Sequence, residues 1–176
     1  MTVIRRAIAI AALLLPSTAF AAKPSPCDGP IPEAPLHGTV MGKPFAPGNA
    51  TVNPLRWLGS YTNSNLVFQD KPGDSMLQVQ VIVRKGTLPD GKTFRHFPVI
   101  DPGQQPQAGK DATEIQGWWL QVPEYKVDYG EISGVATIRV EYGMRHDGKL
   151  PGKLAICIPG TNAVIMGSFN AKIVKL

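Results

Sequence analysis

The chain has 176 residues, and 18 lysines and arginines against 13 aspartates and glutamates give a formal net charge of +5. Because this surplus is modest and no basic run alternates with aromatic residues, the composition gives no reason to expect nucleic acid as a partner. The length fits one domain, and the even spread of 17 prolines and 18 glycines leaves little room for helices.

The first 21 residues have the layout of a secretory signal peptide. A basic pair, Arg5-Arg6, precedes an apolar run over residues 7–15, and the small-residue exit Ala19-Phe20-Ala21 follows. The apolar run is shorter than the roughly 20 residues that cross a bilayer, and no second long run exists. We therefore expect cleavage after residue 21, export to the periplasm or the medium, and no membrane span in the remaining chain.

The exported part, residues 22–176, keeps both cysteines, Cys27 and Cys157. An even cysteine count in an exported chain predicts a disulfide. Such a bond would join an irregular N-terminal arm to a late apolar strand. It would close a loop of about 130 residues, which the chain-entropy model values at roughly 4–5 kcal/mol. The alternative is two independent thiols, with Cys157 packed inside.

Alternation of apolar and polar residues recurs along the chain, and a period of two is typical of strands. It is clear over residues 76–84, 135–142 and 165–173. Turn residues such as Pro89-Asp90-Gly91 and Asp147-Gly148 separate the alternating runs. Eleven segments have strand character, and about nine or ten of them are expected to form strands: 36–41, 49–52, 55–61, 65–69, 76–84, 93–99, 114–122, 124–129, 135–143, 153–158 and 163–174.

Short, frequent strands without intervening helices predict an all-β fold. Strands with one apolar face and one polar face indicate an antiparallel sheet that is buried on one side and exposed to solvent on the other. We therefore expect residues 22–176 to form a single antiparallel β-sandwich, with a closed β-barrel as the alternative. The longest irregular stretch, residues 101–111, is expected to be a surface loop.

The tetrapeptide Gly73-Asp74-Ser75-Met76 resembles the nucleophile block of the GDS-type lipases and esterases. That resemblance implies a serine nucleophile with a histidine base in an Asp-x-x-His element. None of the three histidines here has an aspartate three residues before it, and that family has an α/β fold. The sequence therefore favours a turn that opens the strand at 76–84. Ser75, His96 and His146 remain the first candidates should the chain be a hydrolase.

The histidines do not suggest a metal site. No pair of them has the short spacing of a zinc or copper site, and the loop aspartates match no calcium-binding loop. No metal and no other cofactor is expected.

Adjacent tryptophans, Trp118 and Trp119, give the strongest hint of a functional surface. Neighbouring side chains on a strand point to opposite faces, so one indole can fill the core while the other is exposed or covered by a loop. With Tyr125, Lys126 and Tyr129, an exposed tryptophan would form a patch that binds a protein or a glycan. The sequence favours the other interpretation, in which the two tryptophans are buried on the two sides of an inner strand and one of them is covered by the loop at 101–111.

Three functions remain open from the sequence. The first is a non-catalytic, disulfide-stapled binding or interaction module that meets an unidentified protein or glycan of the cell envelope. The second is a secreted hydrolase whose serine and histidine residues lie on loops. The third is a structural or assembly subunit of the envelope. The first is preferred, and an enzyme is the weaker expectation, because no group of residues has the spacing of a catalytic motif.

Overall fold

A computed structural model describes residues 25–58, 61–84, 87–96, 115–122, 127–130, 136–158 and 162–174. The predicted signal peptide and the predicted loop at 101–111 lie outside these residues. Within them the chain forms a 3₁₀ turn and eleven strands: η1 (Pro26–Asp28), β1 (His37–Val40), β2 (Lys43–Phe45), β3 (Ala50–Leu58), β4 (Tyr61–Phe68), β5 (Met76–Arg84), β6 (Thr93–His96), β7 (Ile115–Val122), β8 (Val127–Gly130), β9 (Thr137–Tyr142), β10 (Lys149–Ile158) and β11 (Ala163–Ile173).

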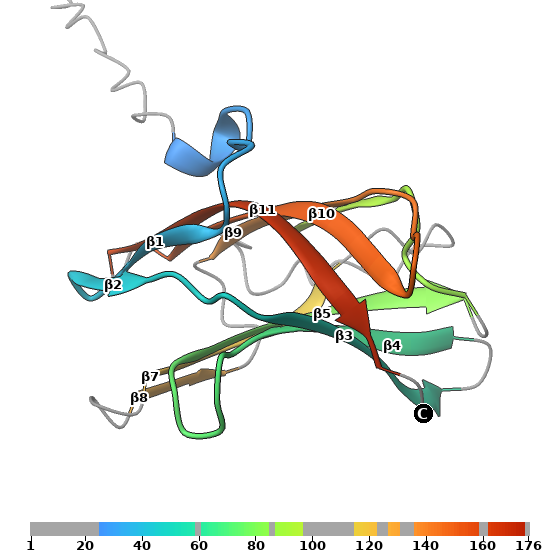
Figure 1. The fold of residues 1–176 in the computed structure, drawn as a ribbon. Coiled ribbons are helices and arrows are strands. Elements are labelled where there is room, and N and C mark those ends of the chain that lie inside the picture. Colours follow the sequence, from blue (N-terminus) through green and yellow to red (C-terminus); the bar gives the residue numbers. More distant parts are fainter. Residues whose placement is uncertain are drawn as a thin grey trace, which may run out of the picture.

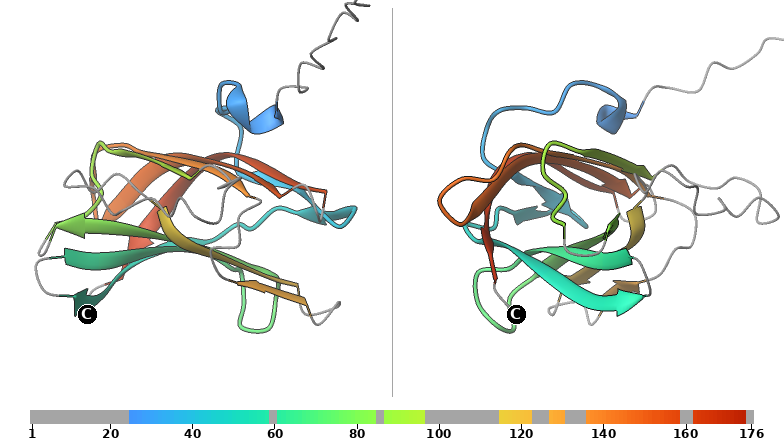
Figure 2. Two further views of the ribbon diagram at one scale, coloured as in Figure 1. Left: turned by 180° about the vertical axis from the view of Figure 1, so that it is seen from behind. Right: turned by 90° about the vertical axis from the view of Figure 1, so that its right-hand side faces the viewer.

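All eleven strands belong to one curled sheet, in the order β6-β9-β10-β11-β3-β4-β5-β7-β8, with β1 on β11 and β2 on β1. The half that contains β1, β9, β10 and β11 lies across from the half that contains β3, β4, β5, β7 and β8 (Figure 1). Seen nearly end-on, the sheet curls round like part of a barrel (Figure 2). The predicted all-β class is therefore confirmed.

The two halves meet where the end of β11 pairs with the start of β3. Lys172 lies opposite Thr51 and Ile173 opposite Val52, and both pairs are parallel. The Val174 N–H extends this seam by donating to the Val52 carbonyl (3.0 Å). The nine other strand pairings are antiparallel, so the sheet is mixed, whereas alternation alone predicts only antiparallel pairs.

Two prolines account for two of the differences between the predicted and the observed strands, and β2 (Lys43–Phe45) was not predicted at all. Pro54 separates two predicted strands, yet β3 runs through it, because the β3–β4 register shifts between Pro54 and Trp57 and a bulge tolerates proline. Pro151 lies inside β10, which begins four residues before the predicted start at residue 153. There the Gly143 N–H donates to the Pro151 carbonyl (2.9 Å), so Pro151 serves as an acceptor and the lack of its own N–H is tolerated.

Alternation correctly predicts which residues fill the space between the halves. Strand β5 has the predicted bounds, and its alternate residues Leu77, Val79, Val81 and Val83 are fully buried. In β9 the buried alternate residues are Ile138, Val140 and Tyr142. These side chains join one continuous core with residues from both halves of the sheet. Burial of this apolar surface is the main force that holds the halves together.

A chain of aromatic rings crosses the core between the halves. Phe68 of β4 lies edge-to-face on Phe169 of β11, with ring centroids 5.4 Å apart. Phe169 in turn meets Tyr142 (5.9 Å), and Tyr142 meets Phe94 (5.8 Å). Gly152 of β10 lies between Tyr142 and Phe169 in the ladder, and its missing side chain makes room for the Phe169 ring.

The N-terminal arm, residues 25–36, covers the outer face of β10 and β11. Cys27 and Cys157 lie at disulfide distance, with their Cα atoms 6.0 Å apart. Around them Ile31 and Ala155 complete a small apolar cluster that is separate from the main core. The predicted pairing of the arm with a late strand therefore agrees with the geometry.

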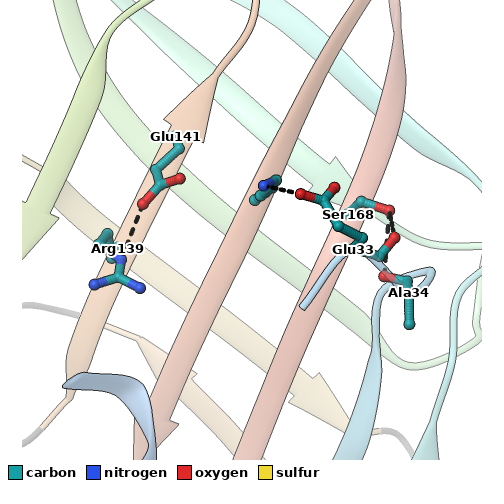
Figure 3. Close-up of polar contacts among 6 residues, drawn as sticks. Glu33, Ala34, Arg139, Glu141 and Ser168 are labelled. Atoms are coloured by element: carbon teal, nitrogen blue, oxygen red, sulfur yellow. Dashed lines mark hydrogen bonds and ion pairs between the residues drawn. The ribbon is translucent and has the colours of Figure 1, made fainter. Parts of the chain in front are cut away.

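Polar contacts fix the rest of the arm (Figure 3). The Ser168 hydroxyl donates to the carbonyls of Glu33 (2.8 Å) and Ala34 (3.2 Å), and Lys153 forms an ion pair with Glu33. Arg139, which is ion-paired to Glu141 (3.2 Å), donates to the Gly29 carbonyl. The arm thus lies on the charged outer face of β9, β10 and β11.

Candidate binding surface

The two tryptophans of β7 point to opposite sides of the sheet. Trp118 is half-buried and packs against the main core, in line with Leu120, which is fully buried. Trp119 has the other orientation and keeps 38% of its surface exposed. It is the one aromatic residue among the large hydrophobic side chains that the structure both describes and leaves exposed, so the expectation that both tryptophans are buried is wrong.

Small or polar residues flank Trp119 across the ladder. On one side it lies opposite Gln78 of β5, and on the other opposite Gly130 of β8. Because glycine has no side chain, Trp119 meets no side chain at its paired position on β8.

The other members of the predicted patch are less well placed by the structure. Tyr125 and Lys126 lie outside the described residues. The backbone of Tyr129 pairs with Leu120 rather than with Trp119. Whether the predicted aromatic patch forms as a unit therefore stays a prediction, and Trp119 is the member with a described exposed surface.

A row of amide side chains lies beside Trp119, and sequence reasoning missed it. Asn53 of β3 lies opposite Asn65 of β4, Asn65 opposite Gln80 of β5, and Gln80 opposite Gly117 of β7. Asn65 lies between Ser64 and Leu66, which are fully buried on the core side, and so takes the outer face. We call Asn53, Asn65 and Gln80 the amide row.

The amide row has unused hydrogen-bonding capacity. The side-chain oxygens of Asn53 and Asn65 are buried and have no hydrogen-bond partner within the described residues. Asn65 is only 6% exposed. Buried polar atoms in proteins are almost always paired, so two orphaned acceptors in neighbouring positions mark this part of the sheet as unusual.

Ser75 is placed by a turn, as the sequence predicts. Asp74 donates its N–H to the Lys71 carbonyl (3.1 Å), Gly73 has a φ of +92°, and β5 begins directly after Ser75. Ser75 lines an open hollow of about 310 Å³ whose other lining residues are Pro44, Phe45, Ala46, Pro47, Asp70, Gly73 and Asp74. No histidine is among them.

Asp70, an acidic residue that lines the hollow, holds a neighbouring loop in place. One carboxylate oxygen of Asp70 accepts the N–H groups of Gly48 (2.7 Å) and Asn49 (3.0 Å) and so holds the loop before β3. Within the residues that the structure covers, no group of three or more His, Cys, Asp or Glu side chains could hold a metal ion.

The two histidines named as candidates lie at opposite ends of β9. His96 ends β6 and pairs with Ile138 near the start of β9. His146 is exposed in the turn that follows β9, where its ring is 3.7 Å from the Asp147 carboxylate. His96 thus lies beside Ile138, whereas His146 lies beyond Tyr142 at the other end of β9. The segment from Ile138 to Tyr142 alone spans four residues, or about 13 Å along a strand. The described backbone thus keeps the two histidines apart.

Tyr142 is a buried tyrosine at the end of β9. It is fully enclosed by the core, and this burial raises the pKa of its hydroxyl. The hydroxyl has no hydrogen-bond partner within the described residues. Its place in the aromatic chain gives Tyr142 a packing role, remote from the outer face that carries Trp119.

None of the helical segments that the structure describes has the length and apolar character needed to cross a membrane. Comparison of the chain with models of protein families, with curated proteins and with solved structures gave no match. Function must therefore be argued from the surface itself.

Proposed function

We propose that the protein is an exported, non-catalytic binding module that presents Trp119 and its surroundings to a protein or glycan of the cell envelope. The proposal includes a disulfide-stapled β-sandwich fold, because the halves of the sheet face each other and are joined by a seam at one side. The signal-like residues 1–21 and the paired Cys27 and Cys157 support export.

The single observation that carries the proposal is the exposure of Trp119. Tryptophan is among the residues that contribute most to binding, because a rigid aromatic ring buries a large area at a small entropic cost. An exposed fraction of 38% applied to a surface of about 250 Å² leaves roughly 95 Å² of ring accessible. At about 25 cal/mol per Å², covering that area contributes about 2 kcal/mol, or roughly 30-fold in affinity.

Pull-down from envelope extract, followed by identification of the bound material, tests this function. The bait is the oxidised protein from residue 22 onward, compared with its Trp119→Ala variant. Each identified component is then titrated against both proteins, and the variant should bind about 30-fold more weakly at an unchanged unfolding midpoint.

A matched control is Met144→Ala. Met144 is 69% exposed and lies in the loop after β9, away from β7. This variant should capture the same material as the parent protein. Binding that is equal in all three proteins would remove the proposal, as would the absence of any captured material.

Export is tested on native protein purified from cells. The expected N-terminus is residue 22, and the folded protein should consume no alkylating reagent until it is reduced. Retention of Met1 together with two reactive thiols would contradict both export and the staple.

A further inference from the structure

We infer that the ligand of the Trp119 surface is a neutral glycan chain, with its sugar rings stacked on Trp119 and its hydroxyls bound by the amide row. This inference rests on the proposed function, because it names the ligand class of the same surface. It commits to a carbohydrate rather than to a protein.

The geometry favours an elongated ligand. The amide row runs across neighbouring strands from β3 to β5, and Gly117 continues it on β7. Neighbouring strands are about 4.8 Å apart, so the row spans about 14 Å from β3 to β7. Trp119 lies two residues beyond Gly117 on the same face of β7. A chain of linked rings can therefore lie across the strands and meet both the indole and the amides.

The chemistry of the row matches hydroxyl groups. An amide side chain offers both donors and acceptors, and a sugar hydroxyl is also both. The orphaned oxygens of Asn53 and Asn65 lack donors within the described residues, and ligand hydroxyls are donors that can satisfy them. The side-chain oxygen of Gln80 lies 3.6 Å from where a Cβ at Gly117 would stand, so this glycine leaves the row open toward β7.

None of the outward side chains that the structure describes on β3, β4, β5 and β7 carries a charge. Arg84 at the end of β5, and Asp128 of β8 opposite Gln121, take outward positions at the borders of this stretch. The outward residues whose side chains are described, read from β3 to β7, are Thr51, Asn53, Val67, Asn65, Met76, Gln78, Gln80, Ile82, Gly117, Trp119 and Gln121. The outer face of the other half differs, because Arg139, Glu141 and Lys153 form ion pairs there. An amide-rich stretch whose described side chains are uncharged, beside an exposed indole, favours a neutral sugar over an acidic or basic polymer.

Calorimetric titration with defined oligosaccharides tests the inference. The probes are the hexasaccharides of the cellulose, chitin and starch series, with oligogalacturonate as a charged comparison. The proteins are the parent, Trp119→Ala, Gln80→Met and Asn170→Ala. Gln80→Met keeps the length of the side chain and removes its hydrogen bonds. Asn170 is an exposed amide on β11 and serves as the matched control.

At least one neutral hexasaccharide should bind, with an affinity that stays constant between about 0.05 and 0.5 M salt. Trp119→Ala should weaken this binding about 30-fold, Gln80→Met about two- to tenfold, and Asn170→Ala should leave it unchanged. Binding of oligogalacturonate alone, or of none of the sugars, would overturn the inference. If an envelope protein is still captured through Trp119 in that case, the binding function stands without the glycan. Loss of all Trp119-dependent capture ends both.

Discussion

Replacing Gly152 with alanine probes the packing that joins the two halves of the sheet. A Cβ at this position would lie 2.4 Å from Cζ of Phe169 and 2.6 Å from the Glu141 carbonyl oxygen. Carbon atoms in good contact are about 3.5–4.0 Å apart, so the added methyl group overlaps a core ring and a neighbouring strand. The strand carbonyl cannot move without disturbing the β9–β10 ladder.

The cost of Gly152→Ala follows from these contacts. Overpacking a core costs about 1–3 kcal/mol, and loss of the edge-to-face contact between Tyr142 and Phe169 adds about 0.5–1.5 kcal/mol. The smaller entropy of the unfolded alanine variant returns about 0.4–1 kcal/mol. We expect a net loss of about 2–3 kcal/mol in the free energy of unfolding.

Equilibrium denaturation of the oxidised protein, followed by tryptophan fluorescence, measures this loss. The transition should shift to lower denaturant at an unchanged slope. Gly117→Ala is the matched control, because a Cβ there meets only the Gln80 side-chain oxygen at 3.6 Å and its stability should hold or rise slightly. A second variant, Phe169→Leu, should lessen the cost of Gly152→Ala but leave the overlap with the strand carbonyl. Equal stability of Gly152→Ala and the parent would refute the reasoning.

Three further predictions concern the arm and the core. Joint replacement of Cys27 and Cys157 by serine should lower the free energy of unfolding by up to about 5 kcal/mol, measured by denaturation, because the bond closes 130 residues; a change below about 1 kcal/mol would count against a stabilising bond. Gly167→Ala should loosen the arm and speed its proteolysis, since Gly167 has a φ of +144° and a Cβ there lies 2.7 Å from the Ala34 carbonyl oxygen; unchanged cleavage would contradict this. Burial raises the pKa of Tyr142, so the parent should lose stability as pH rises above about 10, where unfolded tyrosine ionises. Denaturation at pH 9 and 11, about one unit below and above that pKa, should show that Tyr142→Phe loses less stability than the parent between the two values. An identical pH dependence of the two proteins would contradict the role given to Tyr142.

Local alternation was sufficient to predict several strands and their buried faces, as β5 and β9 illustrate, but it missed β2 and divided β3 into two strands. Alternation does not determine which residues of neighbouring strands lie opposite each other. Asn53, Asn65 and Gln80 lie far apart in the sequence, and they form a row only because two hairpins set the pairing of β3, β4 and β5. The opposite orientations of Trp118 and Trp119 follow from strand geometry, but which of them is exposed depends on where the core lies.

The parallel seam also lay beyond sequence reasoning. It joins Thr51 to Lys172, and no local pattern connects residues at that separation. Pro151 misleads in the other direction, because proline usually ends a strand. Here it is accommodated, since Gly143 needs only the Pro151 carbonyl as an acceptor. Both features depend on tertiary pairing rather than on local preference.

The seam has a consequence for the order of assembly. Each half is built mainly from strands that are neighbours in sequence, so its hairpins can form early. The β3–β11 pairing forms later, because it joins two segments that are remote in the sequence. Cys27 and Cys157, at a separation of 130 residues, are in the same position. We expect the Cys27–Cys157 disulfide to form when the two halves of the sheet finally dock. The rate at which free thiols disappear during oxidative refolding should therefore report when β3 pairs with β11.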